Sequence, residues 1–195
     1  MEQFELNVMG KSVMIEKGLT YGALAQNFQG HCQGGIMVAK QGNYLRELRS
    51  TIHENNDPVV FLDVSSLDGM RVYHRGISFL LAKAVWDLYG KDAVLVIEHS
   101  LRGSLYCEVT VKGKLTAEEA FLKEIKAKIE EYVKADFPIV KQTFAKNKAI
   151  GIMKEQNMQD KVELLRFRRA SNVNLYEVDG FYDYFYGYMP YSTGV

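Results

Sequence analysis

The amino-acid sequence predicts an α+β protein with two domains, because the spacing of its apolar residues changes at a short polar stretch, residues 65–69. Before residue 64, apolar residues alternate with polar residues in short runs, which is typical of β-strands. Within residues 72–90, apolar residues recur at intervals of three and four, which is typical of one face of a helix. Residues 65–69 are mostly polar turn formers between the two patterns. We therefore expect one domain at residues 1–64 and a second at residues 65–195.

The composition is that of a globular chain without a general affinity for polyanions. Of the 195 residues, 47% are hydrophobic, so the chain can bury a substantial core. Its 24 Lys and Arg residues balance 24 Asp and Glu residues, so any nucleic-acid contact depends on a local patch. The local basic concentration consists of Lys161, Arg166, Arg168 and Arg169. Two interpretations of this cluster stay open, a solvated surface and an anion site for a phosphate.

Cysteine usage and hydropathy indicate the compartment. Cys32 and Cys107 stand far apart and form no Cys-x-x-Cys motif, so we do not expect a disulfide framework. The sequence shows neither a signal peptide nor an apolar run near the length of a membrane span. We expect a cytoplasmic protein without a membrane partner.

The first domain is predicted as strands around one short helix. Residues 4–8 and 12–16 alternate around a turn that contains Gly10, which indicates a β-hairpin. Thr20 is placed to cap a short helix. Residues 34–45 predict a strand pair, and residues 58–63 predict a last, buried strand. Strands and helix in this order within about 60 residues are typical of a β-grasp module.

The second domain is predicted to form around a helix at residues 76–89. His74 lies at the expected entrance of this helix, Ser78 stands one turn further on, and Gly90 is placed to end it. The apolar face predicted to be buried consists of Ile77, Leu80, Leu81, Ala84, Val85 and Leu88.

The rest of the second domain alternates strands and helices. Two strands, 93–98 and 104–111, are expected around a turn at 101–103. Thr116 and Glu119 have the spacing of a capping box, and Asp136 stands where the helix that follows should end. A strand at 139–143 and helices at 146–155 and 159–167 follow.

Residues 72–90 resemble the helix that opens the editing domain of threonyl-tRNA synthetase, where a His-x-x-x-His pair begins a hydrolytic site shared with alanyl-tRNA synthetase. Residues 94–109 are similar to the family's strand, Gly-containing turn and aromatic strand. The family's Asp-x-Cys-x-Gly-x-His motif corresponds to residues 183–189. Ser78, Phe185 and Met189 stand where the family has its second His, Cys and last His. The resemblance also implies that residues 1–64 form a TGS domain, the ubiquitin-like module before the editing domain.

The aromatic segment near the end of the chain carries a second resemblance. Residues 180–190 are similar to a segment of bacterial uridine kinase-like proteins, in which TGS and synthetase-like domains precede a P-loop kinase. This chain contains no Gly-x-x-x-x-Gly-Lys-Ser/Thr motif. The resemblance therefore implies a kinase domain after Val195 in a longer protein, with ATP and magnesium as its cofactors and none in this chain.

The replaced positions change the expected chemistry. A hydroxyl, a phenyl ring and a thioether do not supply the ligands that a catalytic zinc requires, so we predict no bound metal. His74 and Asp183 are the remaining candidates for general acid–base catalysis, and neither is assigned as catalytic. We expect Lys161 to contact an anion, His74 and Asp183 to make polar contacts, and Tyr182 or Tyr184 to stack on a ligand.

Three functions stay open. The first is an N-terminal ligand-binding and regulatory region of a uridine kinase-like nucleoside kinase, which would bind a nucleoside or nucleotide. The second is a freestanding or residual aminoacyl-tRNA editing hydrolase, whose partner would be the 3′ end of a tRNA. The third is a structural or oligomerisation module. The sequence leaves the oligomeric state open.

Overall fold

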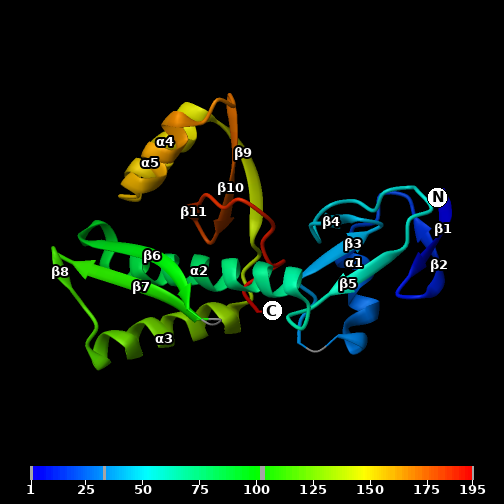
Figure 1. Cartoon of the computed structure of the whole chain (residues 1–195), viewed down its shortest axis with the longest axis horizontal. Helices are drawn as coiled ribbons and strands as arrows, with labels where there is room; N and C mark the ends of the chain where they lie inside the picture. Colours follow the sequence, from blue (N-terminus) through cyan, green and yellow to red (C-terminus); the bar gives the residue numbers. More distant parts are fainter. Residues whose placement is uncertain (1, 33, 102–103, 195) are drawn as a thin grey trace. The chain divides into compact units, whose positions relative to one another are not determined.

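The computed structural model describes residues 2–32, 34–101 and 104–194 (Figure 1). Within this part of the chain it contains three β-sheets and five α-helices, which confirms the predicted mixture of α and β structure. The chain forms two compact units. Unit 1 comprises the residues up to Gly76 together with Tyr186–Thr193, and unit 2 comprises Ile77–Phe185 together with Gly194. The domain boundary after residue 64 stays a prediction.

Unit 1 contains a mixed five-stranded sheet in the order β2-β1-β5-β3-β4. β1 runs parallel to β5, and the other neighbours are antiparallel. The predicted hairpin is confirmed, and its two turn residues, Met9 and Gly10, have φ angles of 52° and 82°. Positive φ at both positions matches the twist of the flanking strands. The strands are β1 (Gln3–Val8), β2 (Lys11–Glu16), β3 (Val38–Gln41), β4 (Tyr44–Arg46) and β5 (Val59–Leu62).

A short helix covers this sheet. The predicted cap is confirmed, because the Thr20 hydroxyl oxygen accepts a hydrogen bond of 3.2 Å from the backbone N–H of Ala23. Helix α1 (Tyr21–Ala25) continues into a 3-10 helix, η1 (Gln26–His31). Its apolar side chains join the sheet in one core, which includes Leu6, Val8, Ile15, Tyr21, Leu24, Phe28, Val59 and Phe61.

The long helix α2 (Leu67–Tyr89) begins nine residues before the predicted start. The polar residues predicted as a turn cap it instead, since the Ser66 hydroxyl oxygen accepts a hydrogen bond of 3.0 Å from the N–H of Gly69. Gly69 is required here, because a Cβ at this position would collide with the backbone oxygen of Asp63. His74 therefore lies about two turns inside the helix and not at its entrance. The helix ends as predicted, before Gly90 with a φ of 55°.

The buried surface of α2 is wider than the predicted face. Leu80, Ala84 and Val85 are buried as expected and Leu81 is partly buried, but Ile77 and Leu88 are 36% and 37% exposed. Phe79 is fully buried, although the predicted face does not include it, and its ring centroid lies 5.5 Å from that of Phe185. The prediction assumed that α2 buries a single face. In the structure, Phe79 packs against Phe185, in addition to the buried face that contains Leu80, Ala84 and Val85.

Unit 2 first forms an antiparallel sheet in the order β6-β7-β8, with β6 (Ala93–Leu101), β7 (Ser104–Val111) and β8 (Lys114–Leu115). Residues 102–103 of the predicted turn lie outside the described residues. The predicted capping box is wrong, because Glu118 is the N-cap of α3 (Glu119–Ala135). The Thr116 N–H instead donates a hydrogen bond of 2.9 Å to the Val109 oxygen of β7. Asp136 ends α3 as predicted, in the left-handed conformation with a φ of 49°.

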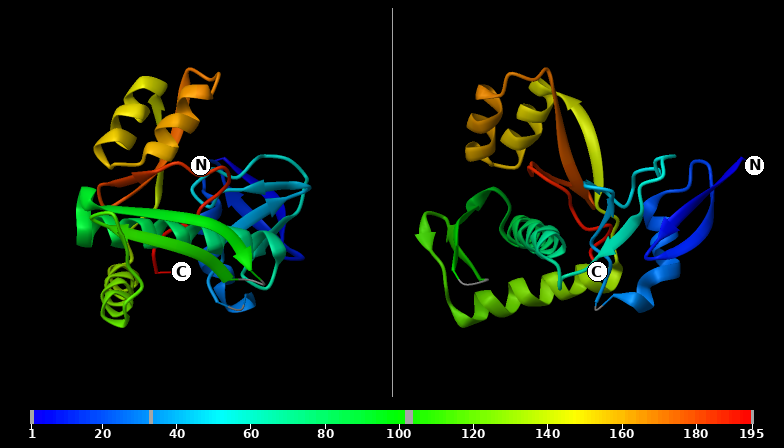
Figure 2. Two further views of the ribbon diagram at one scale, coloured as in Figure 1. Left: turned by 60° about the vertical axis from the view of Figure 1, so that its left-hand side comes forward. Right: turned by 45° about the vertical axis from the view of Figure 1, so that its right-hand side comes forward.

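The second part of unit 2 contains a helix pair on a small antiparallel sheet. Helices α4 (Lys146–Glu155) and α5 (Gln159–Phe167) confirm the prediction and lie side by side in both views of Figure 2. The sheet, in the order β11-β10-β9, consists of β9 (Val140–Ala145), β10 (Asn172–Val178) and β11 (Phe181–Asp183). The sequence predicted β9 but neither of the others. The helix pair and the sheet share one core, which contains Ala149, Met153, Val162, Leu165, Val173 and Leu175.

The aromatic segment near the end of the chain is divided between the two units at Phe185. Its later part, Tyr186–Thr193, is held in unit 1 by two arginines. Arg49 donates a hydrogen bond of 2.7 Å to the Tyr191 oxygen, and its guanidinium carbon lies 4.0 Å from the centroid of the Tyr191 ring. Arg75 donates a hydrogen bond to the Tyr188 oxygen. This part of the segment completes the fold of unit 1.

Candidate functional site

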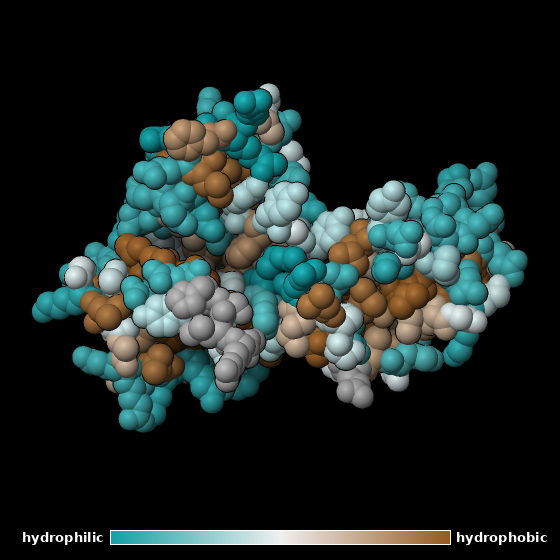
Figure 3. Space-filling view, viewed as in Figure 1, coloured by the Kyte–Doolittle hydropathy of each residue, from teal (hydrophilic) through white to brown (hydrophobic). Residues whose placement is uncertain are grey.

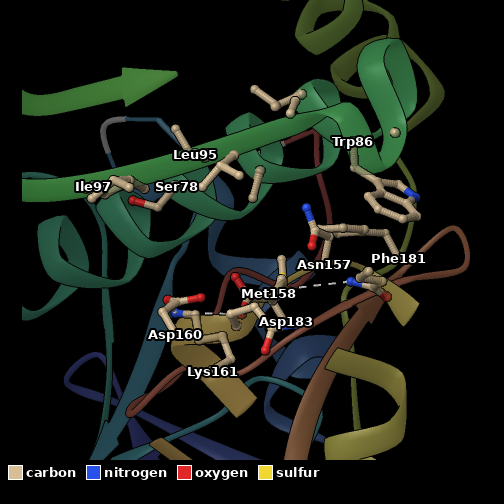
Figure 4. Close-up of a pocket in the computed structure, with 18 of the residues that line it drawn as sticks. Ser78, Trp86, Leu95, Ile97, Asn157, Met158, Asp160, Lys161, Phe181 and Asp183 are labelled. Atoms are coloured by element: carbon tan, nitrogen blue, oxygen red, sulfur yellow. Dashed lines mark hydrogen bonds and ion pairs between the residues drawn. The ribbon is translucent and has the colours of Figure 1, made fainter. Parts of the chain in front are cut away.

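A cavity of about 320 Å³ lies within unit 2 (Figure 4). Figure 4 shows Ser78, Leu95 and Ile97 on one side of the cavity and Asp160, Lys161 and Asp183 on the other. Four parts of the chain line it: α2, β6, the connection from α4 into α5, and β11. Their contributions include Ser78, Ala82 and Trp86; Val94, Leu95, Val96 and Ile97; Asn157, Met158, Asp160 and Lys161; and Phe181 and Asp183.

One wall of the cavity is apolar and aromatic. The ring centroids of Trp86 and Phe181 are 6.4 Å apart, and Phe181 is 2% exposed. Strand β6 adds Val96 and Ile97, whose side chains stay 45% and 37% exposed. Apolar walls that carry a few polar groups are typical of sites for small organic ligands.

Asp160, Lys161 and Asp183 are charged residues that line the cavity. Lys161 Nζ lies 3.7 Å from Asp183 Oδ1 and 4.0 Å from Asp160 Oδ2. Asp183 is 4% exposed, and its Oδ1 accepts a hydrogen bond of 2.6 Å from the N–H of Tyr184. Burial raises the pKa of Asp183 to about 6, although Lys161 and the Tyr184 N–H oppose this rise. A carboxyl group that titrates near neutral pH can exchange a proton with a bound molecule. The structure thus brings together two of the predicted site residues.

Two polar side chains that the sequence analysis did not select hold this part of the site in place. The Gln156 amide donates a hydrogen bond of 2.6 Å to the Tyr182 oxygen and accepts one of 3.0 Å from the Tyr182 N–H. This double contact positions β11, and with it Asp183. Asn157 has a φ of 58° and donates a hydrogen bond of 3.0 Å to the Lys91 oxygen. The sequence did offer a signal for Asn157, because it follows a predicted helix and Asn adopts positive φ angles more readily than most residues.

Tyr182 and Tyr184 are not among the described residues that line the cavity. Side chains alternate along a strand, so the lining by Phe181 and Asp183 directs Tyr182 to the opposite face. There the Tyr182 ring packs edge-on against Phe144, with 5.8 Å between ring centroids. The Tyr184 hydroxyl accepts a hydrogen bond from Arg168. Their predicted stacking on a ligand stays a prediction, and Trp86 is the aromatic ring of α2 that does line the cavity.

His74 belongs to unit 1, although it lies on α2. Its side chain is partly buried, and its ring centroid lies 6.4 Å from that of Tyr73. Its predicted polar contact with a ligand stays a prediction. Ser78, one turn further along α2, lines the cavity.

The donor chemistry at the family's metal positions does not fit a zinc site. Ser78, Phe185 and Met189 offer a hydroxyl, a phenyl ring and a thioether, and Met189 is 2% exposed within unit 1. Among the residues that the structure describes, no group of three His, Cys, Asp or Glu side chains is placed to hold a metal ion. We therefore derive no catalytic step through a metal.

Comparison with known proteins shows which proteins this chain is similar to. No family model matches it. Its relatives include the threonine-tRNA ligase of Syntrophotalea carbinolica, 30% identical over 133 residues, which is 68% of this chain and 21% of the ligase. The corresponding enzyme of Clostridium novyi is 29% identical over 175 residues, 89% of this chain and 27% of the ligase. That of Aquifex aeolicus is 26% identical over 201 residues, 100% of this chain and 30% of the ligase.

These three relatives are all aminoacyl-tRNA ligases. More narrowly, it is homologous to the N-terminal region of threonine-tRNA ligase over most of its length, which confirms the predicted synthetase resemblance. The chain spans between 21% and 30% of the length of these ligases. Because these three relatives are ligases, the predicted link to a uridine kinase-like protein has no support from them. Within the described residues, every helix is too short or too polar to cross a bilayer.

Proposed function

We propose that the cavity of unit 2 receives the aminoacyl-adenosine end of a tRNA and that the chain hydrolyses the aminoacyl ester, as an editing activity. The observation that carries this proposal is the Lys161–Asp183 pair, which lies at a cavity in a chain homologous to threonine-tRNA ligase. The homology favours this function over a regulatory region of a kinase.

The size and lining of the cavity support this class of ligand. A volume of about 320 Å³ lies at the lower end of the range for small-molecule sites. It suits one nucleoside with a small acyl group and excludes an oligonucleotide. Trp86 and Phe181 offer aromatic surface for a base, while Lys161 supplies positive charge.

The proposed hydrolysis uses the residues of the chain alone. A water molecule adds to the ester carbonyl while the Asp183 carboxylate takes one of its protons. The ammonium group of Lys161 stabilises the negative charge that develops on the carbonyl oxygen. The carbon–oxygen bond to the ribose then breaks, and Asp183 returns the proton to the ribose oxygen. The products are the free amino acid and the uncharged tRNA.

The direct test is deacylation of tRNAs charged with threonine, serine or alanine. We expect the protein to release one of these amino acids faster than the spontaneous reaction, and Asp183→Asn to lower the rate about 100-fold or more. Glu163→Gln, a change at an exposed residue of α5, is the matched control and should keep the parental rate. A parental rate equal to spontaneous hydrolysis for all three substrates contradicts the proposed reaction.

Binding without hydrolysis is the second candidate. Ser78, Phe185 and Met189 favour it, because they stand where the family has its hydrolytic ligands. In this case the chain would be a ligand-binding region for a nucleoside or nucleotide, as expected for the kinase-associated function. Calorimetric titration with a non-hydrolysable aminoacyl-adenosine, uridine and ATP separates the two: heat without deacylation selects binding alone. Absence of both leaves the structural or oligomerisation module.

For unit 1 we propose the TGS type of β-grasp module. The mixed sheet, with the parallel pair of β1 and β5 inside it and α1 packed on its core, supports this assignment. The homology to the N-terminal region of threonine-tRNA ligase supports it as well.

A further inference from the structure

The positive charge of this chain is concentrated in one stretch of unit 2. Residues 140–172, from β9 to the start of β10, contain eight Lys and Arg against three Asp and Glu, whereas the rest of the chain contains 16 against 21. The whole chain has no net charge, but residues 140–172 have an excess of positive charge. Such asymmetry indicates attraction to an anionic partner, and only for this part of the molecule.

Within the described part of the chain, six of these eight cations form no ion pair with a carboxylate. Among the described residues, Lys161 pairs with Asp160 and Asp183, but no ion pair joins a carboxylate to Lys146, Lys148, Lys154, Arg166, Arg168 or Arg169. Arg166, Arg168 and Arg169 are exposed. The positive charge of these arginines is thus not neutralised within the described part of the chain. On the exposed face of α3, by contrast, Lys123 pairs with Glu119 at 2.7 Å.

Some of these cations are also held in defined positions. Lys146 donates a hydrogen bond of 3.1 Å to the Arg168 oxygen, and the Arg168 guanidinium carbon lies 5.4 Å from the centroid of the Tyr184 ring, whose hydroxyl it also contacts. The Lys148 Nζ lies 5.1 Å from the centroid of the Phe144 ring. Side chains that are already ordered lose less conformational entropy when a ligand binds.

An aromatic ring stands between the arginines. Phe167 lies at the end of α5 and is 88% exposed, although α5 buries Val162 and Leu165 in the core of the helix pair. The space-filling view shows exposed apolar side chains within a mostly hydrophilic surface over α4 and α5 (Figure 3). Arginines next to an exposed aromatic ring match the two recognition elements of single-stranded nucleic acids, which are the phosphate and the face of the base.

This surface continues from the cavity. Lys161, in the first turn of α5, lines the cavity, and Arg168 follows seven residues later, about 10 Å along the helix. A strand whose terminal nucleotide occupies the cavity would therefore have its preceding nucleotides within reach of Arg166, Phe167 and Arg168.

We propose that Lys146, Lys148, Arg166, Phe167, Arg168 and Arg169 form a binding surface for the single-stranded ribose-phosphate chain of an RNA, next to the nucleotide that the cavity receives. The arginines and lysines contact phosphates, and Phe167 stacks on an unpaired base. This inference rests on the proposed function for the position of the RNA end, but the surface is tested independently of it.

The test measures binding of an RNA hairpin with a single-stranded 3′ extension that ends in adenosine, by fluorescence anisotropy at several salt concentrations. The double variant Arg166→Gln/Arg169→Gln should lose about tenfold in affinity, and its salt slope should fall by about 1.4, since each phosphate contact on a single strand contributes about 0.7. Phe167→Ala should lose about tenfold through the missing stack. These three residues are exposed, so the variants should fold.

The matched control is Lys123→Gln/Lys126→Gln, which removes the same charge from the exposed face of α3 and should change the affinity less than about twofold. Equal losses in both double variants, no loss in either, or no binding of the RNA overturn the proposal. Inorganic polyphosphate that binds as tightly as the RNA, with no effect of Phe167→Ala, also overturns it, because the surface is then a general anion site.

Calorimetry with the aminoacyl-adenosine separates this surface from the function proposed for the cavity. If the nucleoside does not bind but the RNA affinity depends on Arg166, Arg169 and Phe167, the surface stands and the cavity function fails. If the nucleoside binds and the RNA affinity is the same in all variants, the cavity function stands and the surface fails.

Discussion

Lys83 and Asp179 form an ion pair of 3.3 Å between the middle of α2 and the turn that precedes β11. Lys83 is 2% exposed, and its ammonium group also pairs with Asp87 at 2.9 Å and donates a hydrogen bond of 3.3 Å to the Asp179 oxygen. Asp87 in turn accepts a hydrogen bond of 2.6 Å from the Tyr132 hydroxyl of α3. One buried ammonium group thus joins three segments of unit 2.

Removing this ammonium group should destabilise the protein. Lys83→Ala leaves a cavity and two carboxylates without their partner, and we expect a loss of about 2–4 kcal/mol in the free energy of unfolding. This value is below that for fully buried pairs, because the side chains of Asp87 and Asp179 are 27% and 51% exposed. Lys83→Met, which keeps the volume, should cost less. Urea denaturation measures the free energy of unfolding of both variants. A Lys83→Ala variant that is as stable as the parent would show that the ion pairs of Lys83 contribute nothing to stability.

Asp183 should make the stability fall as the pH rises. Its folded pKa of about 6 is above the ordinary value of 3.8, so between these values the folded state binds more protons than the unfolded state. The protonated carboxyl of Asp183 therefore makes its full contribution to the free energy of unfolding below about pH 4, and this contribution is lost as the pH rises through 6. In Asp183→Asn this loss should be absent, and the stability of the variant relative to the parent should increase by about 2 kcal/mol between pH 4 and pH 7. Equal pH dependence in parent and variant would contradict the raised pKa.

Two glycine substitutions in helices should have opposite effects. Gly69→Ala places a Cβ against the Asp63 oxygen and should destabilise the start of α2 by about 2 kcal/mol or more, although Ala favours helices. Gly151→Ala in α4 meets no atom within 4 Å and should stabilise the protein by about 0.5–1 kcal/mol. Thermal unfolding of both variants checks the pair. A Gly69→Ala variant that is as stable as the parent would contradict the close approach of the Asp63 oxygen to Gly69.

Leu81→Asp should be strongly destabilising. Leu81 packs against the core of unit 2, so the substitution brings a carboxylate next to Leu80, Ala84 and Val85. We expect a loss of about 3 kcal/mol. Leu122→Asp on α3 is the matched control, because Leu122 is 56% exposed, and it should change the melting temperature little. A Leu81→Asp variant that melts within a degree or two of the parent would place this face of α2 on the surface.

The sequence predicted the elements whose signal is local. The alternation in β1 and β2, the Thr20 cap and the periodicity of α4 and α5 all appear in the structure, because each depends on neighbouring residues. The start of α2 was missed because Ser66 is typical of turns and of helix caps alike, and the choice depends on its contact with Asp63.

At the cavity, Lys161 and Asp183 were expected from the sequence as ligand contacts, and the structure places their charged atoms 3.7 Å apart. Gln156 was not selected, because an exposed-looking amide at the end of a helix has no signal for a contact with Tyr182, 26 residues later. Tyr182 and Tyr184 were selected for their chemistry alone. The face of a strand that each occupies depends on β11, which the sequence did not predict.

The segment Tyr186–Thr193 determines the order in which the chain can fold during its synthesis. All of unit 2 except Gly194 has been synthesised once Phe185 is added, whereas unit 1, which is made first, still lacks the segment Tyr186–Thr193. The contacts from Arg75 to Tyr188 and from Arg49 to Tyr191 close loops of 113 and 142 residues, which are slow to form compared with local contacts. Although domains generally fold from the N-terminus onward, here the second unit of the nascent chain should reach its final structure before the first.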